Sequence, residues 1–227
     1  MAIPGYCGRI LRVDLTHRRL SEEPLDEGML RSYIGGASLA AKYLYGEGPP
    51  AIDWAHPENR LIFAAGPING ARMAGAGRIA VVAKGALTGG GACSEANGYF
   101  GAYLKFSGFD AIVVQGQAPD CVYLYVHDGM AELRDARNLV GKDTWETETL
   151  VKEELGKRER ELSVYSIGLA GENLVRFAAI VGDQGHVAGH NGLGTVMASK
   201  KLKAVAAARG HGLIEVADPQ ALSQVNK

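Results

Sequence analysis

The chain has 227 residues, of which 47% are hydrophobic, and 24 Lys and Arg stand against 25 Asp and Glu. This is enough apolar material for a large core in one domain or two small ones. The balanced charge, without a basic stripe, argues against a nucleic-acid partner, and no apolar run approaches the ~20 residues of a membrane span, so no membrane partner is expected.

The cysteines are few and irregularly spaced: Cys7, Cys93 and Cys121 form no CxxC pair. An odd number argues against a disulfide framework and predicts a reducing, cytoplasmic location. An iron–sulfur cluster usually takes four thiolates, so this chain alone is not expected to hold one. Cys93 is interpreted as a small buried side chain rather than a catalytic thiol.

The first third of the chain predicts short strands and helices. Alternating apolar residues favour strands over 8–15 and 20–24, joined as a hairpin, and a continuous apolar strand over 61–65. Between them, helices are expected over 26–34, with Asp26 as N-cap, and over 39–45, capped by Ser38.

The stretch Gly75–Gly101 dominates the middle of the sequence. It holds a short apolar strand, 79–82, between two glycine-rich segments, with Arg78 at the start of the strand and Lys84 just past its end. Glu95 and Asn97 are the polar groups of the second segment, which is expected to be a loop. Glycine allows close backbone approach and exposes N–H groups, which suits a phosphate or another flat polar ligand.

The remaining elements follow from turn and periodicity signals. Helices are expected over 100–106, 143–155 and 195–200, and strands over 111–115, 121–127, 131–134, 162–167, 173–181 and 204–208. A second glycine-rich segment covers 182–194. Residues 1–212 are predicted to form one domain, and 213–227 to begin a truncated helical segment, capped by Asp218.

A weak internal echo favours a duplicated half-domain. Ala76-Gly77-Arg78 leads to Lys84, and Ala188-Gly189-His190 leads to Lys200. Coincidence is the competing explanation. A true duplication would place two pseudo-equivalent sites opposite each other.

Several polar residues are candidates for binding. Arg78 is either a surface cation paired with a carboxylate or a guanidinium held in place to bind phosphate or the edge of a heterocycle. The glycines around it favour the binding role. Glu95 and Asn97 are either turn residues or hydrogen-bond partners of a polar ring. His186 and His190 have a spacing that would suit zinc on a helix, but the glycines around them predict a loop.

The glycine segments match no nucleotide-binding motif. A strand rather than a helix follows Gly75-Ala76-Gly77, and residues 85–91 lack the GK[ST] ending of a P-loop. The chain instead resembles, over about residues 5–210, the N-terminal domain of tungsten-dependent aldehyde ferredoxin oxidoreductases. Seven segments carry the resemblance in order: GRILRVDLT, YIGGASLAAKYL, ENRLIFAAGPING, GRIAVVAKGALTGG, GYFGAYLKFSGFDAIVVQG, AGENLVRFAAIV and GLGTVMASKKLKAV.

The resemblance implies an α+β fold of two mixed β-sheets with short helices and a pseudo-twofold internal duplication. The domain would be the base of a tungstopterin, a bis-molybdopterin cofactor with tungsten or molybdenum held by pterin dithiolenes, so no protein side chain is expected to bind the metal. The implied reaction oxidises a small-molecule aldehyde to a carboxylic acid and passes electrons to ferredoxin through a [4Fe–4S] cluster. The cluster would lie in missing C-terminal domains or a separate subunit, so this chain alone is expected to be inactive, with no catalytic residue of its own.

The resemblance also assigns cofactor contacts. The family's pterin-contacting arginine falls on Arg78, and the following contacts fall on Glu95 and Asn97, where the family commonly has Asn and Gly. Its Arg-Ala-Ala-Gly-Arg pattern falls on residues 186–190, which assigns His186, Val187 and Gly189 to the second pterin. These departures lower the positive charge of the site. They leave an alternative open, a non-catalytic scaffold or binding subunit of the same fold with altered or lost cofactor.

Overall fold

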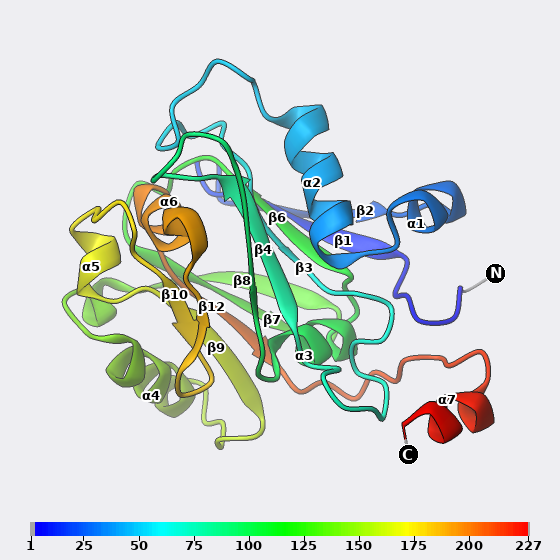
Figure 1. Ribbon diagram of the computed structural model, residues 1–227. Helices are drawn as coiled ribbons and strands as arrows, with labels where there is room; N and C mark the ends of the chain where they lie inside the picture. The colour runs from blue at the N-terminus through cyan, green and yellow to red at the C-terminus, as the bar shows by residue number, and fades with distance from the viewer. Residues whose placement is uncertain (1–2, 227) are drawn as a thin grey trace.

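Two six-stranded mixed β-sheets form the centre of the computed structural model, which describes residues 3–226 (Figure 1). The first sheet has the order β2 (Arg19–Pro24), β1 (Arg9–Asp14), β6 (Ala111–Gln115), β3 (Leu61–Ala64), β4 (Ile79–Lys84), β5 (Gly91–Ala96). The second has the order β8 (Met130–Asp135), β7 (Val122–His127), β12 (Leu202–Ala208), β9 (Leu162–Ser166), β10 (Ile180–Gly182), β11 (His186–Ala188). The predicted fold class is confirmed.

The two sheets repeat one pairing pattern, which bears out the predicted duplication. In each half, the first strand pairs in parallel with the last strand and antiparallel with the second strand. The third, fourth and fifth strands then follow in antiparallel order beside the last. Because the order and direction of all the strands recur, β1–β6 and β7–β12 are structural equivalents.

The sequence echo behind that prediction, however, aligned the wrong residues. The Gly101 amide of the first half donates to the Gly77 carbonyl oxygen at 3.1 Å, and the Gly194 amide of the second half donates to that of Ala178 at 3.0 Å. Gly77 therefore corresponds to Ala178 and not to Gly189. The strand registers instead pair Glu95 with Ala80 in one half and Val187 with Val181 in the other, so Glu95 and Val187 are equivalent.

Helices form three layers around the sheets. The inner faces of both sheets share one core with α3 (Phe100–Phe106) and α6 (Leu193–Ser199). The outer face of the first sheet packs on α1 (Glu27–Tyr33) and α2 (Gly36–Glu47), and that of the second on α4 (Thr144–Glu154) and the 3₁₀ turn η1 (Arg137–Leu139). Each core is apolar and buried, and α3 packs against β9 and β12 of the opposite half. The halves are thereby interlocked.

Three helices start with a side-chain cap, whereas α2, α3, α5 and α6 have none. Asp26 caps α1, Asp143 and Glu146 form a capping box on α4, and Asp218 caps α7 (Pro219–Val225). Ser38 was the wrong prediction for α2, which begins earlier, after Gly35. Gly35 fits there because its φ of 156° and the nearby Ala65 carbonyl leave no room for a side chain.

One expected strand, between β9 and the β10–β11 hairpin, is much shorter than predicted. The strand predicted over 173–181 is confined to Ile180–Gly182, because α5 (Leu169–Glu172) ends at Asn173 and Leu174 has a φ of +55°. On α4, Glu148 is buried, and its carboxylate binds the Lys152 ammonium at 2.5 Å. Glu148 also accepts a hydrogen bond from the Gln184 amide, so it holds the β10–β11 turn.

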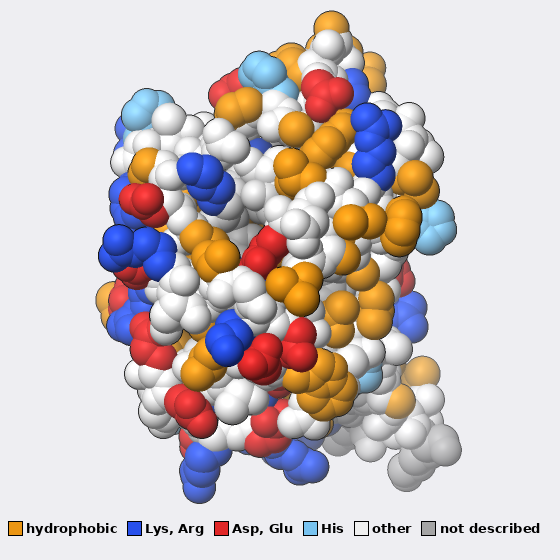
Figure 2. Space-filling view, turned by 90° about the vertical axis from the view of Figure 1, so that its left-hand side faces the viewer, with side chains coloured by type: hydrophobic (Ala, Val, Ile, Leu, Met, Phe, Trp, Pro, Cys, Tyr) orange, Lys and Arg blue, Asp and Glu red, His pale blue; other side chains and the backbone are white. Residues whose placement is uncertain are grey.

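Charged groups of both signs are scattered over the face shown in Figure 2, which also gathers hydrophobic side chains. This is the side on which α4 and α5 lie in Figure 1. The exposed large apolar residues of the chain include Leu169 on α5, and Leu174 and Phe177 after it. Within residues 3–226, no helix has the length and apolar content to span a membrane.

Lys200 gives the fold a pH dependence that can be measured. Its ammonium is buried and donates to the Pro57 and Gly116 carbonyl oxygens. Burial lowers the pKa of Lys200 to about 7, and Arg60 adds to the effect. The unfolded chain, with an ordinary lysine pKa near ~10.4, then binds more protons than the folded chain between these values.

The cost of burying the charge is therefore complete below pH 7 and falls as the pH rises. Between pH 7 and 9, the free energy of unfolding of the wild type should increase by about 2 kcal/mol relative to Lys200→Met. Urea unfolding of both proteins at several pH values measures this difference. A constant difference would show that Lys200 keeps its charge in the folded chain.

Candidate functional site

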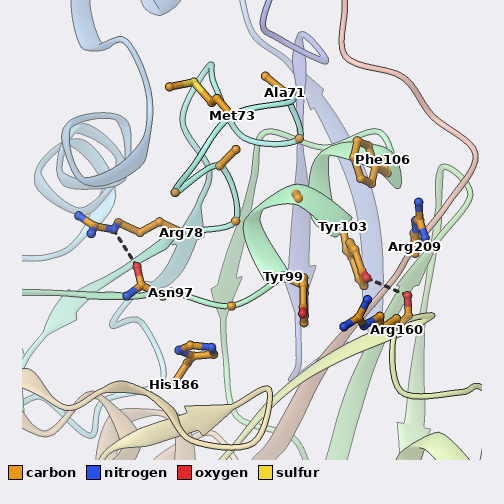
Figure 3. A pocket seen from close by; sticks show the side chains of 16 residues that line it. Ala71, Met73, Arg78, Asn97, Tyr99, Tyr103, Phe106, Arg160, His186 and Arg209 are labelled. Carbon is orange, nitrogen blue, oxygen red and sulfur yellow. Dashed lines mark hydrogen bonds between the residues drawn. The ribbon is translucent and has the colours of Figure 1, made fainter. Parts of the chain in front are cut away.

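A cavity of about 740 Å³ lies at the junction of the two halves (Figure 3). The segment before β4, the end of β5 and the start of α3 form most of it, and the β10–β11 hairpin and the ends of β9 and β12 complete it. Its lining side chains and glycines are Gly70, Ala71, Met73, Gly75, Ala76, Gly77, Arg78, Asn97, Gly98, Tyr99, Ala102, Tyr103, Phe106, Arg160, His186 and Arg209.

Arg78 is held by two polar neighbours at one side of the cavity. Its Nη1 lies 3.1 Å from Glu95 Oε2, and its Nε donates to Asn97 Oδ1 at 3.2 Å. Both side chains of the ion pair are about half exposed, with 57% for Arg78 and 46% for Glu95. The pair is therefore solvent-screened, and another anion can displace Glu95.

The glycines beside Arg78 are there for close packing. A Cβ on Gly77 would overlap the Gly98 carbonyl oxygen, and one on Gly101 would overlap the Arg78 carbonyl oxygen. Gly98 has a φ of +99° and faces the Asp183 carboxylate. The backbone of 77–78 thus lies directly on that of 98–101, and this surface has few side chains to keep a ligand away from it.

Asp183 ties the two halves together beneath the cavity. Its Oδ2 accepts hydrogen bonds from the Tyr99 amide at 2.7 Å and from Ser163 Oγ at 2.8 Å. Burial raises the pKa of Asp183, an effect that these two hydrogen bonds oppose. The Tyr165 hydroxyl also donates to the Asn97 carbonyl oxygen. The second half therefore fixes the position of the glycine segment of the first.

The predicted site residues are only partly brought together. Arg78, Asn97 and His186 line the cavity, and Glu95 contacts Arg78 from outside the lining. Val187 and Gly189 do not line it; Val187 is exposed on β11, and Gly189 follows this strand. Glu95, His186 and Val187 lie on strands, which corrects the expected loops, since β5 and β11 extend through both segments.

The lining carries positive charge without a carboxylate. Arg78, Arg160, Arg209 and His186 are its ionisable cationic groups, and no Asp or Glu is among the lining residues. In residues 3–226, no group of three or more His, Cys, Asp or Glu side chains could hold a metal ion. Cys93 was wrongly interpreted as buried, because it lies exposed on β5. Desolvation nevertheless raises the pKa of Cys7, Cys93 and Cys121, so all three thiols stay protonated near neutral pH. The donor set suits an anionic ligand that approaches the backbone closely.

Among the lining residues that sequence reasoning missed are two tyrosines and two arginines. Tyr99 is the N-cap residue of the correctly predicted α3, Tyr103 lies one turn later, and their rings stack with centroids 5.6 Å apart. Arg160 and Arg209 flank the ends of β9 and β12, which are distant in sequence but adjacent in the sheet. The i, i+4 spacing of the two tyrosines could have indicated from the sequence that their rings lie together. The proximity of the two arginines could not be predicted in this way, because it depends on the pairing of β9 with β12.

Comparison with known proteins identifies relatives of this chain. The family described as "Aldehyde ferredoxin oxidoreductase, N-terminal domain" matches residues 10–209. The tungsten-containing aldehyde ferredoxin oxidoreductase of Pyrococcus abyssi is 46% identical over 214 residues, which are 94% of this chain and 35% of the relative. The chain thus spans about a third of the length of such curated relatives.

Two other relatives have different names. The WOR-like subunit of an aliphatic sulfonate oxidoreductase from Pyrococcus furiosus is 36% identical and is matched over 95% of this chain and 36% of its own length. A solved structure of the active-site complex BamBC of benzoyl coenzyme A reductase, with 1,5-dienoyl-CoA, superposes with a TM-score of 0.89. That match has 36% identity and covers 92% of this chain and 32% of the other. The chain therefore belongs to the aldehyde ferredoxin oxidoreductase family and matches its N-terminal domain.

Proposed function

We propose that this chain is the cofactor-binding domain of a tungstopterin or molybdopterin oxidoreductase that oxidises aldehydes to carboxylic acids. The observation that carries the proposal is the carboxylate-free, arginine-bearing cavity on the glycine backbone surface between the two halves. The names of the tungsten-containing relatives support the metal. The domain is proposed to span residues 1–212, with 213–227 beginning the next segment.

The residues of the cavity fit a pterin cofactor in their chemistry. Arg78 can clamp a phosphate or the edge of the pterin with its guanidinium fork, and Asn97 offers an amide to the same ring system. The surface around Gly77 and Gly98 admits a flat group to backbone contact. His186, with the backbone of Val187 and Gly189, is proposed to shape the cradle of a second pterin from the β10–β11 hairpin.

The reaction divides between this chain and parts outside it. When bound, the metal centre supplies two-electron oxidation, in which an aldehyde and water become a carboxylic acid with release of two protons and two electrons. The proposed acceptor is ferredoxin, reached through a [4Fe–4S] cluster held by further domains or a separate subunit. The residues of this chain bind and orient the cofactor and exclude water from one face of it.

Aldehyde-dependent reduction of a viologen dye under anaerobic conditions tests this division. The protein from its native source, with the polypeptide that continues or accompanies the chain, should reduce the dye. The 227-residue chain alone should give no turnover. Turnover by the chain alone would place the acid–base chemistry here and contradict the proposal.

One observation favours a second candidate, a scaffold or binding subunit with altered or lost cofactor. Glu95 already supplies an anion to Arg78. In the second half, the equivalent position is the apolar Val187, so only one half carries this carboxylate. A permanent pair of this kind would keep a phosphate from Arg78 and leave the fold without its ligand.

Glu95→Gln separates the two functions. If Glu95 only competes with the anionic cofactor, the substitution removes the competitor and should raise the affinity for inorganic pyrophosphate roughly fivefold. Isothermal titration calorimetry of wild type and variant measures the change. The scaffold function requires that the wild type binds no anion at Arg78, so that Arg78→Gln leaves the wild-type affinity unchanged.

A further inference from the structure

We propose that Arg160 and Arg209, with Tyr103 as the wall beside them, form a second oxyanion subsite, at the end of the cavity away from Arg78, for a group of the phosphate class. In Figure 3, Arg78 and Asn97 lie on one side of the cavity, Arg160 and Arg209 on the other, and the two stacked tyrosines of α3 between them. This deepens the proposed function, since it adds a second anion contact to the same cavity.

The backbone brings the two arginines together. Strands β9 and β12 run antiparallel, and Leu162 pairs with Ala208 at their ends. Arg160 lies just before β9 and Arg209 just after β12, and the Arg209 amide donates to the Glu161 carbonyl oxygen at 2.8 Å. The sheet register therefore fixes the backbones that carry both guanidinium groups.

Tyr103 forms the wall between the arginines and the rest of the cavity. Its hydroxyl donates to the Arg160 carbonyl oxygen at 2.8 Å, which fixes the turn before β9 on helix α3. Burial raises the pKa of Tyr103, and the charges of Arg209 and Arg160 oppose this rise, so both cations act on the ring. A ligand held by the arginines would touch the stacked rings of Tyr99 and Tyr103.

Neither Arg160 nor Arg209 forms an ion pair with a carboxylate of the described residues. The adjacent carboxylate of Glu161 binds Arg158 at 2.5 Å instead. Arginines on a convex surface are simply solvated. Arg160 and Arg209 instead line one cavity whose lining residues include no carboxylate, so both guanidinium groups can donate hydrogen bonds to one oxyanion there.

Two sources could supply the anion, namely the phosphate of the bound cofactor and a free phosphorylated molecule. The probe for both is inorganic pyrophosphate, titrated calorimetrically at low ionic strength because salt screens exposed charges. The wild-type 227-residue chain should bind it. The double variant Arg160→Gln/Arg209→Gln should lose at least ~10-fold in affinity, whereas Arg31→Gln, which removes a paired cation on α1, should change it less than ~2-fold.

Two further arms identify the site and the source. Arg78→Gln should still bind pyrophosphate at the Arg160 and Arg209 subsite, the site whose binding the double variant loses. If the phosphate of the cofactor is the natural ligand, protein purified with its cofactor should bind no pyrophosphate at this subsite. If the natural ligand is a free phosphorylated molecule, the cofactor-loaded protein should bind pyrophosphate as the apo chain does. Absence of binding to the apo chain, or equal binding by the double variant and wild type, would overturn the subsite. The pyrophosphate titrations of the apo chain do not require the cofactor. They therefore test the subsite even if the proposed cofactor is wrong.

Discussion

Gly77→Ala is expected to prevent residues 77–78 from packing on residues 98–101 and to lower the free energy of unfolding by at least about 4 kcal/mol. The added methyl group would overlap the Gly98 carbonyl oxygen, which is backbone and cannot rotate away. Gly98 is itself packed against Asp183, so the segment has no free direction in which to move. Urea unfolding followed by circular dichroism measures the loss.

Gly91→Ala is the matched control. Gly91 begins β5 on the same sheet, its added Cβ would meet nothing within 4 Å, and its φ is not in the left-handed region. Its stability should stay within about 0.5 kcal/mol of the wild type. A Gly77→Ala protein as stable as this control would show that the two glycine segments are not packed as described.

Arg78→Gln is expected to reduce the cofactor content of the purified protein at least ~10-fold, since charge-assisted guanidinium contacts to phosphate are lost. Stability should change little, because the Arg78–Glu95 pair is about half exposed. Metal analysis by inductively coupled plasma mass spectrometry measures the content, and urea unfolding checks the fold.

Arg78→Lys refines this prediction. Lysine keeps the charge but not the planar fork, so its cofactor content should fall between those of wild type and Arg78→Gln. Arg137→Gln removes an exposed cation that pairs with Asp135 elsewhere, and it should behave as wild type. Full retention of the cofactor by Arg78→Gln would remove Arg78 from the site.

Local sequence signals predicted much of the secondary structure. The helix over 100–106 and the strand over 111–115 match α3 and β6, and the strands expected over 121–127 and 131–134 match β7 and β8. Capping side chains explain the success at Asp26 and Asp143. The failure over 173–181 came from interpreting apolar residues as a strand where the chain makes turns between α5 and β10.

The site was less accessible to sequence reasoning because it is assembled across the two halves. The resemblance indicated Arg78, Asn97 and His186, and all three line the cavity. Nothing local indicates that Asp183 reaches the Tyr99 amide, or that Arg160 and Arg209 meet at the ends of β9 and β12. Those contacts depend on strand register and on the packing of α3 against the opposite sheet.

The most direct test of the cofactor-binding function is elemental and pterin analysis of the protein purified without oxygen from its native source. Tungsten and molybdenum are determined by mass spectrometry, and pterin by the fluorescence of its oxidised form, each relative to chain concentration. Stoichiometric tungsten or molybdenum together with pterin, both lost in Arg78→Gln, is the expected result. Folded protein with neither metal nor pterin would contradict the cofactor-binding function.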